Sequence, residues 1–128
     1  MDYLVFWEVI NIVLIFKALA EESRLRILSL LLQNDMCVCE LEDGQKLKQS
    51  NLSRHLSALK SSGILSSYKK AQWVYYKIDE DFIREHRLLW LYIEEKIKEL
   101  SSFEEDIKNL EISKMENICT RDNILQEL

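Results

Sequence analysis

Glycine is scarce in this chain and proline is absent, since Gly44 and Gly63 are the only residues of either type among 128. Phosphate-binding loops of the GxGxxG type need three glycines, and the GxxxxGK[ST] loop needs two that are five residues apart. Neither loop can be formed by this sequence. The only histidines are His55 and His86, so the HExxH zinc-protease motif is absent too. No spacing marks a nucleophile–base pair or an acid pair, and we expect that the chain is not an enzyme.

The length and composition indicate one soluble globular domain over residues 1–128, with 48% hydrophobic and 30% charged residues. Between residues 3 and 16 only Glu8 and Asn11 are polar. A membrane-spanning helix needs about 20 apolar residues, and a signal peptide needs a basic segment and a cleavage site. We therefore interpret this segment as a buried or subunit-interface helix and expect no membrane partner. Three cysteines without secretion features indicate a reducing cytoplasm.

Charge is divided unevenly along the chain. The net charge is −5, but the segment 46–77 contains seven basic and no acidic residues and carries +7, while the remainder carries −12. A local field of this kind suits a polyanion such as DNA, whatever the overall charge. The alternative is a chance cluster on a solvated surface. The residues of this basic segment are Lys46, Lys48, Arg54, Lys60, Lys69, Lys70 and Lys77.

The apolar periodicity predicts a mainly helical chain that ends in a hairpin and a further helix. The seam of Ile93, Ile97, Leu100, Phe103, Ile107 and Leu110 predicts one long amphipathic helix, or two in succession, from residue 80. The order helix, short helix, helix, hairpin is that of a winged helix-turn-helix, a mainly α fold with a β-hairpin wing. The expected elements are helices over 3–16, 22–33, 38–45 and 49–61, strands over 64–68 and 73–78 around a turn at 69–72, and a helix over 80–110.

The helix that begins at residue 49 is the predicted recognition helix. A helix N-terminus presents free N–H groups and a partial positive charge, both suited to phosphate. Arg54 can donate two hydrogen bonds to guanine, and the hairpin tip can reach neighbouring phosphates or the minor groove. The alternatives are a helix cap at Ser50, a packing role for His55 and solvated charges at the tip. The predicted DNA contacts are Gln49, Ser50, Asn51, Ser53, Arg54 and His55 on the helix and Lys69, Lys70 and Gln72 on the hairpin.

Several segments resemble the ArsR/SmtB family of metal-sensing repressors, over about residues 16–78. They are FKALA at 16–20, SRLRIL at 23–28, CVCEL at 37–41, QSNLSRHL at 49–56, Gly63 and WVYY at 73–76. The resemblance implies a homodimer that binds an inverted-repeat operator and leaves it when metal binds. It also implies the organisation of the single domain: a dimerisation helix within 1–20, the helix-turn-helix and wing at 38–78, a second dimerisation helix at 80–110 and a tail at 111–128.

The CVC motif is similar to that of arsenic-responsive members, and the resemblance implies that Cys37 and Cys39 bind trivalent arsenic or antimony. Soft thiolates suit such ions, and a helix N-terminus is expected to lower the thiol pKa. In a regular helix, residues two apart point about 200° from each other. We therefore expect the turn to unwind when both sulfurs hold one ion, which would disturb the adjacent DNA-binding unit. The alternative is two small buried residues.

The chain departs from the family pattern at two places. A glycine often precedes the recognition helix, where this chain has Lys46, and arsenic sensors often carry a third cysteine where this chain has Glu42. Cys119 is then a tentative third ligand, and a two-thiolate site for a methylated trivalent arsenical is the alternative. A zinc site on the last helix is not expected, because only His86 is available there. Two other functions stay open: a thiol-redox-sensing repressor, and a protein-interaction module with an incidental basic face.

Overall fold

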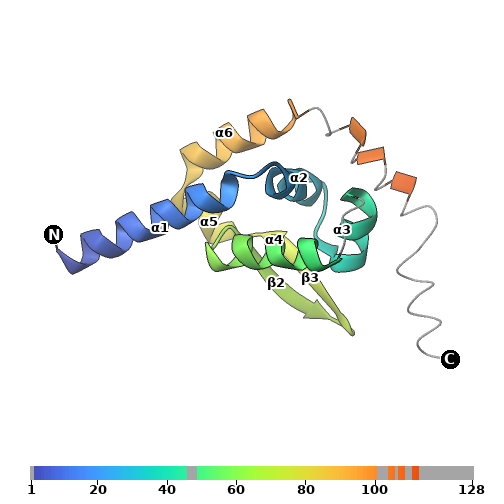
Figure 1. Cartoon of the computed structure of the whole chain (residues 1–128), viewed down its shortest axis with the longest axis horizontal. Helices are drawn as coiled ribbons and strands as arrows, with labels where there is room; N and C mark the ends of the chain where they lie inside the picture. Colours follow the sequence, from blue (N-terminus) through green and yellow to red (C-terminus); the bar gives the residue numbers. More distant parts are fainter. Residues whose placement is uncertain (1, 46–48, 101–103, 106, 109–110, 113–128) are drawn as a thin grey trace.

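The computed structural model describes residues 2–45, 49–100, 104–105, 107–108 and 111–112 (Figure 1). Lys46, Lys48 and Cys119 lie outside these residues. The position at which Lys46 replaces the glycine of the family pattern is therefore not described. The architecture is a winged helix-turn-helix, mainly helical with a small antiparallel sheet, as the sequence predicts. Its elements are α1 (Tyr3–Leu19), α2 (Glu22–Leu31), β1 (Met36–Cys37), α3 (Val38–Gln45), α4 (Gln49–Ser61), β2 (Leu65–Lys70), β3 (Trp73–Ile78), α5 (Glu80–Glu85) and α6 (Arg87–Ile97).

The core lies where α2, α3 and α4 meet. Leu52, Leu56 and Leu59 recur on one face of α4 and are fully or almost fully buried, as residues spaced by four and three along a helix are expected to be. They belong to one cluster of buried side chains that includes Leu28 of α2 and Leu41 of α3. This packing fixes α4 against the body, with its opposite face turned to solvent.

The hairpin of β2 and β3 is the wing, and Gly63 starts it. Gly63 has a φ of 84°, a left-handed conformation that glycine adopts without strain and that ends α4. The expected turn at 69–72 is wrong in detail, because Lys69 and Lys70 extend β2 and pair with Val74 and Trp73. The chain reverses at residues 71–72.

A third strand joins the wing, in the sheet order β1-β3-β2. The two-residue β1 pairs antiparallel with β3, with Cys37 opposite Tyr75. The sequence did not predict β1, because two residues are too few to show the alternation of apolar and polar residues that marks a strand. The wing is therefore joined directly to the segment that carries the cysteines.

The helix expected over 80–110 consists of two helices in succession over its first part. Asp79 caps α5 by accepting a hydrogen bond from the backbone N–H of Phe82, at 3.0 Å. At His86 the backbone leaves the helical region, with φ −121° and ψ 47°, and α6 begins immediately afterwards. The buried residues of α6, Trp90, Ile93 and Ile97, face the core.

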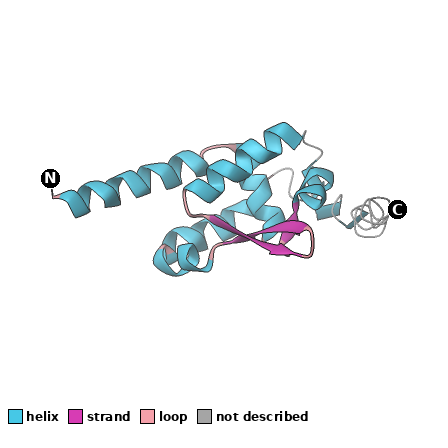
Figure 2. Cartoon of the chain, turned by 90° about the horizontal axis from the view of Figure 1, so that it is seen from below, coloured by secondary structure: helices cyan, strands magenta, loops and turns pink. Residues whose placement is uncertain are grey.

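Helix α1 projects from the body of the molecule (Figures 1 and 2). Its apolar side chains are mostly exposed; only Ile15, Ala18 and Leu19 near its C-terminal end are buried. Among the described helices, none is by itself long and apolar enough to cross a membrane. Helices α1 and α2 pass that test only together, and they meet at a bend of 90°.

Candidate nucleic-acid interface and thiol site

Helix α4 and the wing lie on one side of the molecule, opposite α6 (Figure 1). On α4 the side chains of Asn51, Ser53 and Arg54 are exposed, since they fall on the face opposite the buried leucines. Lys69 and Lys70 are exposed at the end of the wing. The structure thus brings most of the predicted DNA contacts to one side, with Gln49 and Ser50 in the first turn of α4 and Gln72 exposed in the wing turn.

The basic segment is not equally available over its length. Lys60 Nζ donates a hydrogen bond to Ser67 Oγ at 2.6 Å, and Lys77 forms an ion pair with Glu80 at 3.6 Å. These two lysines are engaged with neighbouring side chains. Among the described residues, the positive charge that faces solvent on this side comes chiefly from the recognition helix and the wing tip.

His55 is not a DNA contact, and this prediction was wrong. Its side chain is 2% exposed, because it falls on the same face of α4 as Leu52, Leu56 and Leu59. Its Nδ1 accepts a hydrogen bond from Arg24 Nε at 3.2 Å, and its Nε2 lies 3.3 Å from a carboxylate oxygen of Glu21. Burial lowers the pKa of His55, which favours the neutral imidazole that this hydrogen bond requires.

The spacing of His55 from the leucines of the same helix already indicates that it packs in the core. Position 55 follows Leu52 by three residues and precedes Leu59 by four, which is the core pattern of a helix. Glu21 and Arg24, the partners of His55, were not singled out in the sequence, because only the fold brings the start of α2 next to α4. The three side chains tie these two helices together.

The two nearby cysteines lie on different elements. Cys37 ends β1 and Cys39 lies in the first turn of α3, and their Sγ atoms are 3.2 Å apart. Two sulfurs that each lie about 2.3 Å from a shared ion, as in zinc–thiolate sites, are separated by less than about 4.6 Å. The expectation that the turn must unwind is therefore wrong, because the strand-to-helix junction already points both sulfurs to one place.

Cys37 sits in an environment that keeps it protonated. Burial raises the pKa of the Cys37 thiol to about 11, so the expectation of a lowered pKa at this helix start is wrong. Its Sγ donates to Glu40 Oε1 at 3.3 Å, and its backbone N–H donates to the same oxygen at 3.2 Å. Cys39 is disulfide-bonded. A pair of thiols at this place therefore requires the reduced protein.

A hollow of about 280 Å³ opens beside the two cysteines. Its walls come from the start of α3 and from the wing. The carboxylate of Glu42 belongs to it, and Glu42 Oε1 is buried without a hydrogen-bond partner among the described residues. The sequence did not single out Trp73 and Val74 as part of a site, because only the β1–β3 pairing brings them there. The lining residues are Cys37, Val38, Cys39, Glu42, Trp73 and Val74.

Within the ranges that the structure describes, no group of three or more histidine, cysteine, aspartate or glutamate side chains gathers in a way that could hold a metal ion. The tentative third ligand, Cys119, lies outside those ranges. Among the described residues, Cys37 and Cys39 are a pair of neighbouring sulfurs, 3.2 Å apart.

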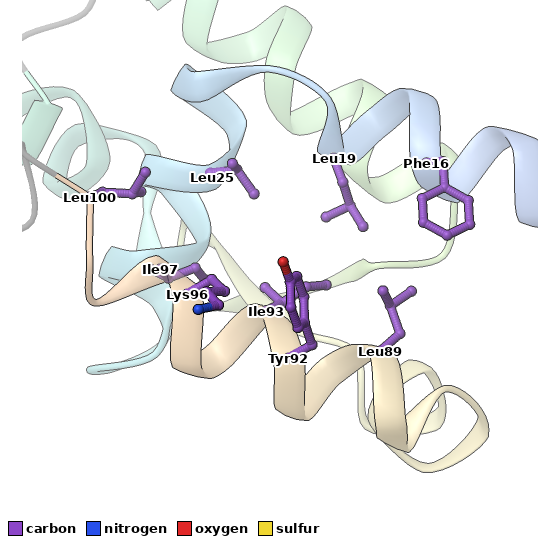
Figure 3. Close-up of a pocket in the computed structure, with 9 residues that line it drawn as sticks. All are labelled: Phe16, Leu19, Leu25, Leu89, Tyr92, Ile93, Lys96, Ile97 and Leu100. Atoms are coloured by element: carbon purple, nitrogen blue, oxygen red, sulfur yellow. The ribbon is translucent and has the colours of Figure 1, made fainter.

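A second hollow, of about 270 Å³, lies between α1, α2 and α6 (Figure 3). Its lining is apolar apart from Lys96 and the Tyr92 hydroxyl, and the Lys96 ammonium lies 5.9 Å from the centre of the Tyr92 ring. It adjoins the exposed apolar surface of α1 and α6. The labelled side chains that surround it are Phe16, Leu19, Leu25, Leu89, Tyr92, Ile93, Lys96, Ile97 and Leu100.

Comparison with known proteins places this arrangement among transcriptional regulators. Residues 21–67 match the family described as bacterial regulatory protein, arsR family. The arsenic resistance transcriptional regulator ArsR1 of Pseudomonas putida is 40% identical over 72 residues, which are 56% of each chain. The uncharacterized HTH-type transcriptional regulator MJ1325 of Methanocaldococcus jannaschii is 43% identical over 72 residues, or 56% of this chain and 81% of that protein. The chain thus matches little more than half the length of the first of these relatives.

A solved structure shows the same fold. The homodimeric winged helix-turn-helix DNA-binding domain from Mycobacterium bovis, a possible ArsR-family regulator, has a TM-score of 0.64 and 26% identity, covering 79% of this chain and 94% of that one. These similar proteins are transcriptional regulators and not enzymes, which agrees with the expectation from the sequence.

Proposed function

Because this chain belongs to the ArsR family of winged-helix transcriptional regulators, we propose that it is a dimeric repressor that trivalent arsenic or antimony releases from its operator. The observation that carries the effector is the pair of sulfurs, 3.2 Å apart, at the junction of β1 and α3. Thiolates are the ligands that soft, thiophilic ions prefer. The P. putida relative is named as an arsenic resistance regulator, which supports the same effector.

Operator binding by α4 and the wing is supported by their shared side of the molecule. The exposed polar residues of α4 reach base edges in the major groove, where Arg54 is suited to guanine. Lys69 and Lys70 contact phosphates on either side and set the affinity without reading sequence.

Release follows from the position of the two cysteines. Cys37 pairs with Tyr75 of the wing, and Cys39 belongs to α3, which packs against α4. An ion bound to both sulfurs fixes β1 relative to α3. Since one of these elements is joined to the wing and the other to the recognition helix, a shift between them changes the DNA-binding surface.

Dimerisation is supported by the apolar surface of α1 and α6. Trp7 is 47% exposed and Leu88 is 85% exposed, and a monomer rarely exposes a contiguous apolar surface of this extent. The M. bovis domain is a homodimer. Two-fold symmetry implies an inverted-repeat operator whose half-sites lie one DNA turn, about 34 Å, apart. A regulator of this kind works in the cytoplasm.

Redox sensing is the second candidate, and the disulfide at Cys39 favours it. Oxidation of the thiols would then replace arsenic binding as the event that alters the α3–wing junction. The two candidates share the DNA-binding surface and differ only in what acts on the cysteines.

The experiment that tests the proposal starts by selecting a duplex from a random library with the reduced protein. Binding to the labelled duplex is then followed by fluorescence anisotropy during separate titrations with arsenite, antimonite and hydrogen peroxide. The proposal expects release by arsenite or antimonite and an inverted repeat in the selected duplex. Release by peroxide alone would establish the redox candidate, and failure to select any duplex would reject DNA binding.

A further inference from the structure

Two side-chain hydrogen bonds join the wing strand β2 to the body of the molecule. From α4, Lys60 Nζ donates to Ser67 Oγ at 2.6 Å. At the next residue of the strand, the Tyr68 hydroxyl donates to Asp35 Oδ2 at 2.7 Å. Asp35 lies between α2 and β1, so the strand is held by two different parts of the body. Beyond these contacts β2 continues into the exposed tip of the hairpin (Figure 1).

The ring of Tyr68 is held in place as well as its hydroxyl. Tyr68 pairs with Tyr75 across the hairpin, and the two rings are stacked, with centroids 5.6 Å apart and planes 13° from parallel. Aromatic pairs on adjacent strands stabilise a sheet. Since β3 fixes the ring and Asp35 fixes the hydroxyl, the Tyr68 side chain has one defined direction.

Tyr68 immediately precedes the two lysines of the wing tip. Lys69 and Lys70 follow it on β2, and Lys70 belongs to the last pair of the hairpin before the turn. At about 3.3 Å per residue of strand, both lysines lie within roughly 7 Å of Tyr68 along the backbone. The direction of the strand at Tyr68 therefore sets the place that the lysine side chains can reach. A hairpin already held in its bound direction also loses less conformational entropy on binding.

We propose that Tyr68 is a positioning residue for DNA binding, whose hydrogen bond to Asp35 holds the wing where Lys69 and Lys70 reach phosphate. This inference rests on the proposed function and adds two residues that act through the wing lysines without touching DNA. A carboxylate beside a phosphate-binding hairpin weakens the local positive field. We therefore expect Asp35 to aid binding only through this hydrogen bond.

The test measures the affinity of the full-length protein for the selected duplex by fluorescence anisotropy at several salt concentrations. Tyr68→Phe keeps the ring and removes the hydrogen bond, so it should weaken binding roughly three- to tenfold. It should also lower the slope of log K against log salt by part of the value of about 0.9 that each phosphate contact contributes. A role in stability alone would leave that slope unchanged. Because Lys60 still holds Ser67 in this variant, the hairpin should stay folded.

Asp35 provides a matched pair of variants. Asp35→Asn removes the charge but keeps an oxygen that accepts from the Tyr68 hydroxyl, so it should bind at least as tightly as the wild-type protein. Asp35→Ala removes the charge and the acceptor, so it should bind roughly three- to tenfold more weakly than Asp35→Asn. The comparison separates the hydrogen bond from the charge.

The wing lysines separate positioning from direct contact. In a protein that already carries Lys69→Ala and Lys70→Ala, Tyr68→Phe should have no further effect, because groups that act through one another are not additive. A full effect of Tyr68→Phe in that protein, or equal affinities of Asp35→Ala and Asp35→Asn, would overturn the inference and leave the proposed function standing. An unchanged affinity in Tyr68→Phe would do the same. Failure of the wild-type protein to bind any duplex would reject both.

Discussion

At the scale of single residues, Cys37 and His55 are buried polar groups with opposite consequences. His55 is satisfied by Arg24 and Glu21, so it serves packing between helices. Cys37 faces a hollow shared with Cys39, so it can still be reached by a small molecule. Burial keeps its thiol neutral, so an effector that binds the sulfur must also remove the thiol proton.

The raised pKa of Cys37 predicts different pH profiles for two classes of effector. At pH 6 to 8 the thiol is protonated, since its pKa is about 11. Arsenous acid brings its own hydroxides, which leave as water with the thiol protons, so its half-effective concentration for DNA release should stay level. A divalent cation such as Cd²⁺ must expel the thiol protons, so its affinity should rise by about tenfold per pH unit for each proton expelled. Release measured at pH 6, 7 and 8 checks this, and a steep arsenite profile would contradict it.

His55 and Arg54 are neighbours with separate predicted roles, and each serves as the control for the other. His55→Ala removes the buried imidazole and its contacts with Arg24 and Glu21, so it should lower the free energy of unfolding by roughly 1–3 kcal/mol while the folded fraction binds DNA normally. Arg54→Ala should leave stability within about 0.5 kcal/mol and weaken operator binding by roughly 1–3 kcal/mol. Urea unfolding and anisotropy measure the two effects. Unchanged stability with lost DNA binding in His55→Ala would restore His55 as a DNA contact.

At the scale of elements, the wing links the proposed DNA-binding surface to the hollow beside the cysteines. Its tip carries Lys69 and Lys70, its strand β3 supplies Trp73 and Val74 to the hollow, and β3 also pairs with the strand that ends at Cys37. One hairpin thus touches both surfaces.

The two wing lysines are predicted to supply phosphate contacts without reading sequence. Replacing Lys69 and Lys70 with alanine should weaken binding to all duplexes alike, and each lost phosphate contact should reduce the slope of log K against log salt by about 0.9. Anisotropy titrations at several salt concentrations measure the slope. The control removes two exposed lysines outside the basic segment, Lys98 and Lys108. An equal slope in the wild-type protein and the wing variant would show that the wing does not contact phosphate.

Most of the helices and strands could be predicted from the sequence, because apolar residues recur at regular spacing in the long helices and in the hairpin. The spacing of Leu52, Leu56 and Leu59 predicts both the existence and the buried face of α4. The short strand β1 could not be predicted, since it exists only through its pairing with β3. For the same reason the closeness of the two sulfurs, and the contribution of Trp73, follow from tertiary structure and not from local pattern.

At the scale of the whole molecule, the apolar surface of α1 and α6 predicts a dimer at micromolar concentration. Val9 and Val13 lie four residues apart on α1, and both are exposed. Changing both to glutamate should give a monomer by sedimentation, with helix content retained by circular dichroism, because charges would be buried at the interface. The monomer should also lose most of its affinity for an inverted repeat while it retains weak binding to a half-site. A variant that remains dimeric would place the interface elsewhere.

The central claim is that an arsenical bound to Cys37 and Cys39 releases the dimer from DNA. The measurement is arsenite-dependent release of the selected duplex by the reduced wild-type protein and by Cys37→Ser, Cys39→Ser and Cys119→Ser, each first shown to bind the duplex. The account predicts release from the wild-type protein and loss of release in Cys37→Ser and Cys39→Ser; loss in Cys119→Ser as well would identify Cys119 as the third ligand for arsenite. Undiminished release in either Cys37→Ser or Cys39→Ser would contradict the account.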